Sequence, residues 1–189
     1  MHRREVLELL VSLATAGILG GSCPLAFAGQ KPELPDASFQ KLPRWYGFNL
    51  PNMKHFDGRR NPRWGFEDWQ FDTLSTRGFN FVRLQLDYRY FINGRDPLDF
   101  NAEGLSHLDK ALELGKKHGV HVNFSFYRAP GFSITGNGRD VALWKDDRVV
   151  EICAKHWAHI AERYKGERNI HLSFNLFNEP TWVTPERYR

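Results

Sequence analysis

The sequence predicts an α/β fold, a (β/α)8 barrel represented by about its first four βα units. Two observations lead to this prediction. Strand-like and helix-like segments alternate along the chain, and strands joined by crossover helices are parallel. The predicted strands also alternate apolar with polar residues, whereas strands covered by helices on both faces read as near-continuous apolar runs. A barrel whose interior opens into a polar site accounts for both observations.

The predicted strands cover residues 45–50, 79–86, 120–127 and 170–177. In the second of them, apolar Val82 and Leu84 alternate with Arg83 and Gln85. The third and fourth strands follow the same rule, with one apolar face and one largely polar face. The apolar face suits packing against helices, so the polar face is expected to line the barrel interior.

The predicted helices cover residues 65–77, 102–118 and 146–165. A glycine follows each helix, and glycine readily adopts the left-handed conformation that ends helices. Apolar residues at helical spacing predict which side of a helix is buried. In the helices at 65–77 and 146–165 these residues are Phe66, Trp69, Leu74, Val149, Val150, Cys153 and Trp157.

The first 28 residues have the pattern of an export signal peptide. Arg3 and Arg4 precede an apolar stretch that Glu8 interrupts, and Ala26-Phe27-Ala28 places small residues where a signal peptidase requires them. The arginine pair also resembles a twin-arginine signal, and a general secretory signal stays open. The apolar stretch is too short and broken for a stable membrane span. We therefore expect an exported protein, periplasmic or extracellular.

The remaining chain is expected to comprise a Pro-rich leader over residues 29–43 and the N-terminal half of the barrel over residues 44–189. Net charge is +4 without a basic stripe, which argues against nucleic-acid binding. After cleavage Cys153 is the one remaining cysteine, so no internal disulfide is expected. The histidines lack metal-ligand spacing, and neither a cofactor nor a metal is implied. The sequence carries no signal for an oligomeric state.

The fourth predicted strand stops at Asn178-Glu179-Pro180. Proline cannot continue a strand ladder, so Glu179 is expected at the strand's carboxyl end. A carboxylate in that position, beside an amide side chain, suits acid–base chemistry on a sugar.

Four motifs in this order resemble glycoside hydrolase family 5, the cellulase-type retaining barrel enzymes. They are Gly47-Phe48-Asn49-Leu50, Gly78-Phe79-Asn80-Phe81-Val82-Arg83-Leu84, Arg128-Ala129-Pro130-Gly131 and Asn178-Glu179-Pro180. The resemblance implies that Glu179 is the general acid and base, that Asn178 binds a sugar hydroxyl and that Arg83 supports the nucleophilic glutamate. The competing interpretations are a surface salt bridge for Glu179, a turn-forming role for Asn178 and a structural ion pair for Arg83.

The sequence departs from the family at Tyr127, where the resemblance leads us to expect histidine. Tyrosine still donates a hydrogen bond to a sugar hydroxyl, but it lacks the imidazole's geometry. Trp182 and Trp144 are candidate stacking platforms for a sugar ring, with buried packing as the alternative. Asp87 either binds substrate or forms a salt bridge with Arg89 or Arg95.

The resemblance implies a second carboxylate at the end of a seventh strand. A complete barrel takes about 250 residues, and this chain of 189 reaches the fourth strand. We therefore expect a fragment that is inactive alone, whose full-length parent is a retaining endo-β-glycanase acting on a β-linked polysaccharide, β-1,4-glucan first. The alternatives are a β-mannanase-type glycosidase and a non-catalytic carbohydrate-binding barrel.

Overall fold

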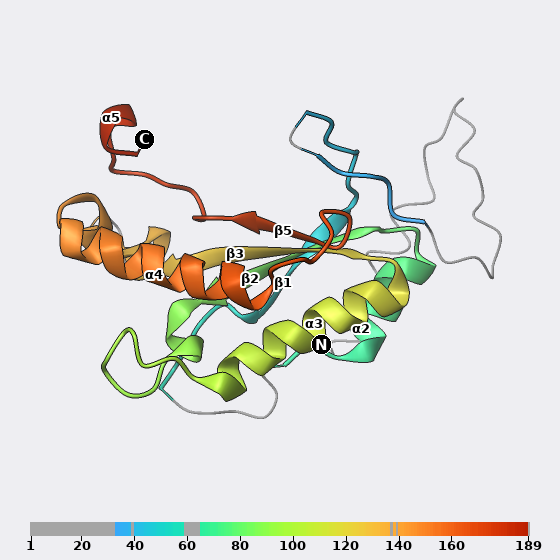
Figure 1. The fold of residues 1–189 in the computed structure, drawn as a ribbon, viewed down its shortest axis with the longest axis horizontal. Coiled ribbons are helices and arrows are strands. Elements are labelled where there is room, and N and C mark those ends of the chain that lie inside the picture. The colour runs from blue at the N-terminus through green and yellow to red at the C-terminus, as the bar shows by residue number, and fades with distance from the viewer. Residues whose placement is uncertain (1–32, 39, 59–64, 137, 139, 189) are drawn as a thin grey trace, which may run out of the picture. The chain divides into compact units, whose positions relative to one another are not determined.

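The computed structural model describes residues 33–38, 40–58, 65–136, 138 and 140–188 (Figure 1). The predicted signal peptide and its cleavage site lie outside these residues. Among the described residues, every helix is too short or too polar to cross a bilayer.

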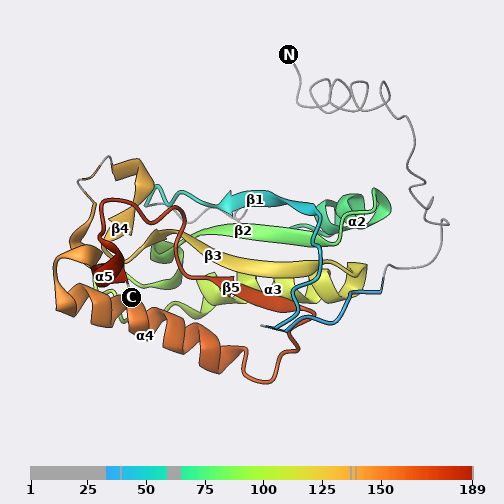
Figure 2. The ribbon, with the colours of Figure 1, turned by 90° about the horizontal axis from the view of Figure 1, so that it is seen from above.

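A parallel sheet forms the centre of the fold. Its parallel strands are β1 (Gly47–Met53), β2 (Phe81–Asp87), β3 (His121–Ala129) and β5 (Leu172–Asn175). They lie in the order β1-β2-β3-β5, and a two-residue strand, β4 (Phe132–Ser133), pairs antiparallel with the end of β3. Figure 2 shows the four parallel strands side by side. The predicted succession of parallel strands joined by helices is confirmed.

Three main helices connect the strands: α2 (Asp68–Thr76), α3 (Ala102–His118) and α4 (Asp147–Arg163). In Figure 1, α2 and α3 lie below the sheet, and in Figure 2 α4 runs along the β5 side. Short segments complete the fold: η2 (Tyr88–Phe91), η3 (Ile134–Gly136), η4 (Ala142–Trp144) and α5 (Pro185–Tyr188).

Helix α3 has the predicted bounds because both of its ends are capped. The side chain of Asn101 accepts a hydrogen bond from the backbone N–H of Gly104 at 3.1 Å. Gly119 adopts φ 66°, a left-handed conformation, and donates its N–H to the carbonyl of Gly115. Helix α4 begins at Asp147, one residue later than predicted, because Asp146 caps it by accepting from the N–H of Arg148.

The core lies between the sheet and the helices. Apolar strand residues Val82, Leu84, Val122 and Phe124 are fully buried there, and the buried residues of α3 face them. Cys153 is buried as well, which confirms its prediction as a small core residue. The opposite face of the sheet carries the alternate, polar residues, as the sequence predicted.

Two predicted core positions are wrong. Trp69 is 64% exposed and Val150 is 40% exposed. Helix α2 buries Phe71 and Leu74, and Trp69 lies two residues before Phe71, which turns it to the opposite side of the helix. Trp157 does pack inward, with its ring centroid 4.6 Å from that of Phe126.

The fourth parallel strand is shorter than predicted. Residues 170–177 were expected to be extended, and β5 covers Leu172–Asn175. Its pairing with β3 ends at the Ser125–Asn175 pair. Within the described chain β5 pairs with β3 alone, and Phe174 on it stays partly exposed.

Candidate active site

Polar side chains line up across the sheet on the face away from the helices. The parallel registers place Asn49 beside Arg83, Arg83 beside Asn123, and Asn123 beside Ser173. The next layer toward the carboxyl ends contains Gln85, Ser125 and Asn175. This polar face matches the barrel interior predicted from the alternating pattern.

Aromatic rings pack at the amino end of the same face. The rings of Trp45 and Phe81 both stack on His121, with centroids 4.4 Å and 5.7 Å away. Burial lowers the pKa of His121, so its imidazole is neutral near pH 7. This stack occupies the amino end, and the candidate site residues lie toward the carboxyl ends of the strands.

Arg83 connects three strands to the segment after β5. Its Nη2 donates to Ser125 Oγ at 2.7 Å and to Asn178 Oδ1 at 2.9 Å, and its Nη1 lies 3.5 Å from Asn49 Oδ1. Burial lowers the pKa of Arg83, and the charge of Glu179 opposes that shift. A guanidinium stays protonated throughout the physiological range, so Arg83 presents a fixed positive charge to Glu179.

Asn178 is buried, and hydrogen bonds hold both its backbone and its side chain. Its N–H donates to the carbonyl of Phe126 at 2.8 Å, and its Oδ1 accepts from Arg83. Its amide Nδ2 has no hydrogen-bond partner among the described residues. A buried amide donor without a partner is costly, so one hydrogen-bonding capacity of Asn178 is left unused in this structure.

The chain turns sharply after Asn178. Glu179 has φ 49° and Trp182 has φ 57°, and both therefore lie in the left-handed region that non-glycine residues seldom occupy. Such conformations cost about 1 kcal/mol or more and cluster at functional sites. The turn carries the chain from a buried Asn178 to an exposed Glu179, so the carboxylate faces solvent at the end of the strand.

Tyr127 lies near the carboxyl end of β3, where two residues that follow β1 contact its ring. The ammonium of Lys54 lies 4.2 Å from the centre of its ring, and the imidazole of His55 meets the ring edge-on with centroids 5.5 Å apart. Sequence reasoning missed Lys54 and His55. The available signal was their position directly after a strand, because parallel strands end at the same edge of the sheet.

The two candidate tryptophans differ in their surroundings. Trp182 is 52% exposed, and its ring packs against Gly138. Trp144 instead packs its ring against Phe132 and Phe177, with centroids 5.0 Å and 5.5 Å away. The packing interpretation therefore holds for Trp144, whereas Trp182 has a free ring surface.

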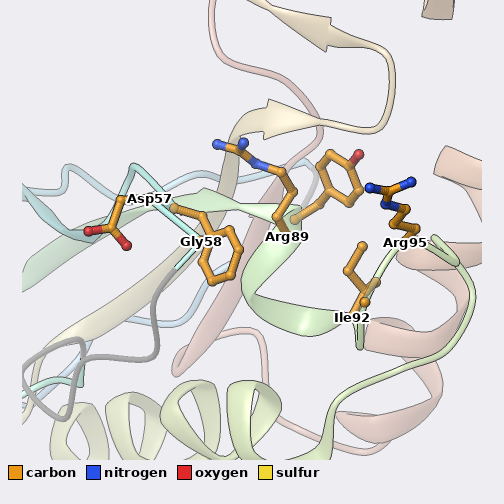
Figure 3. Close-up of a pocket in the computed structure, with 8 residues that line it drawn as sticks. Asp57, Gly58, Arg89, Ile92 and Arg95 are labelled. Atoms are coloured by element: carbon orange, nitrogen blue, oxygen red, sulfur yellow. The ribbon is translucent and has the colours of Figure 1, made fainter.

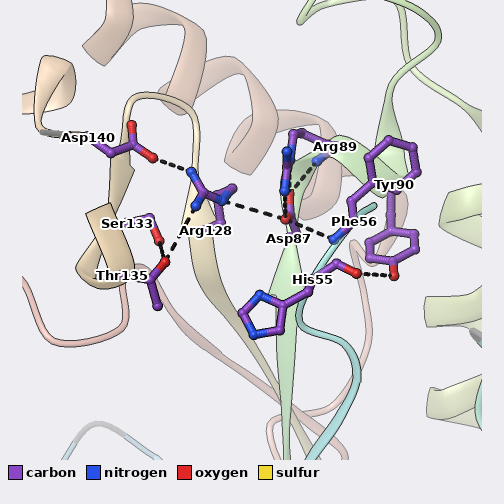
Figure 4. Close-up of polar contacts among 9 residues, drawn as sticks. All are labelled: His55, Phe56, Asp87, Arg89, Tyr90, Arg128, Ser133, Thr135 and Asp140. Carbon is purple, nitrogen blue, oxygen red and sulfur yellow. Dashed lines mark hydrogen bonds and ion pairs between the residues drawn. The ribbon is translucent and has the colours of Figure 1, made fainter. Parts of the chain in front are cut away.

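Asp87 is a fully buried carboxylate at the end of β2 (Figure 4). Arg89 donates to it through Nε at 2.9 Å and through Nη2 at 2.5 Å. Phe56 N–H donates to it at 3.2 Å, and Arg128 Nε lies 3.7 Å away. Arg128 in turn pairs with Asp140. The salt-bridge interpretation of Asp87 is confirmed with Arg89, and the network joins the segments that follow β1, β2 and β4.

No group of three or more potential metal-binding side chains occurs within residues 33–188 as far as they are described. The site is thus built from one exposed carboxylate, a buried amide, a guanidinium, a phenol and aromatic rings. A carboxylate next to a buried amide and near a guanidinium, at the carboxyl ends of parallel strands, is typical of the polar site of a (β/α)-barrel protein.

Comparison with known proteins identifies the family. The family model described as cellulase (glycosyl hydrolase family 5) matches residues 42–187, and the chain belongs to that family. The resemblance seen in the four motifs is thereby confirmed.

The chain is similar in sequence to several named glycosidases. The chain is 30% identical over 108 residues to endoglucanase C of Acetivibrio thermocellus, a match that covers 57% of this chain and 31% of the relative. It is 29% identical over 125 residues to a beta-xylosidase of Phanerodontia chrysosporium, covering 61% of this chain and 25% of that protein. The chain therefore spans about a third or less of the length of these relatives.

The fold is also similar to those of solved glycoside hydrolase structures. A crystal structure of a glycoside hydrolase superposes with a TM-score of 0.69 at 31% identity, covering 76% of this chain and 46% of that one. A hyperthermophilic endo-beta-1,4-glucanase, solved in complex with substrate, superposes with a TM-score of 0.55 at 21% identity and shows the shared fold. The prediction of a partial (β/α) barrel is confirmed.

Proposed function

We propose that the whole protein is a retaining endo-β-glycanase that hydrolyses O-glycosidic bonds in a β-linked polysaccharide. The observation that carries the proposal is the geometry after β5. A left-handed turn presents the Glu179 carboxylate at the barrel's carboxyl end, directly after the buried, partly unsatisfied Asn178. Retaining glycoside hydrolysis needs such a carboxyl group to protonate the leaving oxygen and then to activate water.

Each neighbouring side chain has a role in this scheme. Glu179 is the general acid and then the general base. Asn178 donates its free amide hydrogen to a sugar hydroxyl, and Arg83 holds that amide in place through its 2.9 Å bond. Tyr127 donates its phenolic O–H to substrate, and its ring contacts Lys54 and His55. Trp182 offers its exposed ring as a stacking platform for a sugar unit.

The nucleophile is a second carboxylate, about 5 Å from Glu179. We place it outside the described residues, in the part of the barrel that the family's longer members contain. Residues 33–188 alone are accordingly expected to bind glycan weakly and to leave it intact.

A β-1,4-glucan is the proposed substrate. Several relatives carry names that refer to glucans, including endoglucanase C and cellodextrinase A of Ruminococcus flavefaciens, the latter 29% identical over 104 residues. A β-mannan is the second candidate substrate. A non-catalytic binding barrel is the second candidate function, and the tyrosine at position 127 is the observation that favours it.

Substitution of Glu179 tests the proposal. In the whole protein, Glu179→Gln is expected to lower kcat on carboxymethyl-cellulose about 10²- to 10⁴-fold, the usual contribution of general acid–base catalysis. The matched control is Glu186→Gln, an exposed glutamate in α5, which is expected to hydrolyse at the original rate. The formation of reducing ends measures both.

A substrate with a good leaving group sharpens the result. Aryl cellobiosides with acidic phenols need no protonation to leave, so Glu179→Gln is expected to slow their first bond cleavage far less than that of the polysaccharide. Equal loss on both substrates would remove Glu179 from the acid role. Binding of cello-oligosaccharides without turnover by the original protein would identify a binding barrel instead.

We also propose that the protein is exported and cleaved after Ala28. The supporting pattern is Arg3-Arg4, the interrupted apolar stretch and Ala26-Phe27-Ala28. N-terminal sequencing of the protein from the culture medium and periplasm tests this, and a mature chain that begins with Met1 would contradict it.

A further inference from the structure

A pocket lies at the carboxyl end of β2, beside the residues assigned above but separate from them (Figure 3). The segment after β1, the η2 turn and the segment after η2 form its walls. Its volume is about 750 Å3, within the range of small-molecule sites. Because β2 and β5 are parallel, the pocket opens at the same end of the sheet as Glu179.

Arg89 supplies a rigid cation to the pocket wall. Two hydrogen bonds to the buried Asp87 hold its guanidinium, and the Phe56 ring lies 5.7 Å from the guanidinium carbon. The bond to Asp87 raises the pKa of Arg89, so the charge persists at every physiological pH. The side chain is still 37% exposed, which leaves part of the guanidinium free for a ligand.

Arg95 supplies a second cation. It lines the pocket from the segment after η2 and is exposed. No ion pair of Arg95 is present in the described part of the chain. Figure 3 shows the guanidinium groups of Arg89 and Arg95 apart from each other along one edge of the pocket, with Asp57 on the side of Arg89 and far from Arg95. The free cationic end of the pocket therefore favours an anion.

The rest of the lining suits a sugar ring. Phe56 and Tyr88 contribute aromatic surface, and Ile92 adds an apolar wall. Burial raises the pKa of Tyr88, so its phenol stays neutral and keeps its O–H as a donor. A pocket with aromatic surface, a neutral donor and two guanidinium groups fits a carbohydrate that bears a carboxylate, because guanidinium and carboxylate pair in a planar, two-bond geometry.

We propose that this pocket binds a uronic acid unit of the glycan, with the sugar carboxylate on Arg95 and Arg89 adding to the positive charge of the wall. The inference rests on the proposed function in that the ligand is a glycan. It adds a preference for acidic over neutral sugar at a position away from the bond that is cleaved.

The experiment compares two disaccharides that differ in one group. Cellobiouronic acid carries a carboxylate where cellobiose carries a hydroxymethyl group, and isothermal titration of the whole protein measures both affinities. We expect the acid to bind about tenfold more tightly, the usual effect of a charged hydrogen bond. The preference is expected to shrink at about 1 M salt, where charges are screened beyond about 3 Å.

Arg95→Gln is expected to abolish the preference for the acid. The matched control is Arg77→Gln, an exposed arginine at the C-terminal end of α2, at the opposite end of the sheet. That variant is expected to keep the full preference. Equal affinity for acid and neutral sugar, or an unchanged preference in Arg95→Gln, would overturn the inference.

The pocket proposal and the proposed catalytic function can fail independently of each other. Hydrolysis of neutral glucan without any preference for the acid overturns the pocket assignment and leaves the role of Glu179 standing. A preference for the acid that persists in Glu179→Gln supports the pocket independently of catalysis.

Discussion

Substitution of Asp87 by Asn gives the most direct test of the structure. The two oxygens of Asp87 each accept two hydrogen bonds: Oδ1 from the N–H and Nε of Arg89, and Oδ2 from Arg89 Nη2 and Phe56 N–H. Asparagine keeps one acceptor oxygen and replaces the other with an amide NH2 group, which donates and cannot accept. The two hydrogen-bond donors that faced the lost oxygen then face a third donor. The positive charge of Arg89 also loses the negative charge that balanced it.

The expected loss of unfolding free energy follows from the burial of the ion pair. Removing one member of a buried ion pair costs about 3–5 kcal/mol. Asp87 is fully buried, but the Arg89 side chain is 37% exposed and can regain water, so the lower end applies. We expect the free energy of unfolding to fall by about 3 kcal/mol, which for a protein of this size lowers Tm by roughly 6–12 °C.

The chain contains a matched control. Asp146 caps α4 and binds Arg148 by the same three types of contact, from the backbone N–H at 3.0 Å, Nε at 3.1 Å and Nη2 at 2.8 Å. There Arg148 is 87% exposed, so both groups rehydrate when the pair is broken. Urea and thermal unfolding of Asp87→Asn and Asp146→Asn, followed by circular dichroism, compare the two. Equal losses of stability would refute the reasoning from burial.

Two further predictions concern the core. A Cβ on Gly115 would lie 2.5 Å from Val122 Cγ2 and 2.7 Å from the carbonyl of Val120, so Gly115→Ala is expected to lower the free energy of unfolding by about 1–3 kcal/mol through overpacking of α3 on β3; an unchanged urea midpoint contradicts this. Burial lowers the pKa of His156 to about 4, while its Nε2 lies 2.7 Å from the Pro97 carbonyl. In the unfolded chain His156 has a pKa near 6.5, so as the pH falls the unfolded state takes up a proton before the folded state does. The stability that neutral His156 contributes to the fold is therefore complete above about pH 6.5 and is lost toward pH 4. Stability measured across that range is expected to fall less in His156→Gln than in the original protein, and parallel pH profiles would contradict the assignment.

Local sequence patterns predicted the elements whose causes are local. Helix α3 has its predicted bounds because Asn101 and Gly119, next to its ends in the chain, cap it. The polar face of the strands was predicted because side chains alternate by simple geometry, whatever lies beyond. The position of Glu179 after a strand followed in the same way from the proline behind it.

The face of a short helix was harder to predict. Trp69 looked like a core residue because it is aromatic and stands near other apolar residues. The tertiary fold buries Phe71 and Leu74 instead, and the nine residues of α2 contain too few turns for the sequence alone to choose the buried side.

The sequence by itself determined the class of fold, the family motifs and the residue types at the candidate site. Only the tertiary structure decided which of them meet. Asp87 contacts Arg128, Tyr127 contacts Lys54 and His55, and Arg83 reaches Asn178 across 95 positions in the chain. The physical reason is that the strands are parallel, so their carboxyl ends bring together loops that are distant in sequence, and no local pattern records which side chains then touch.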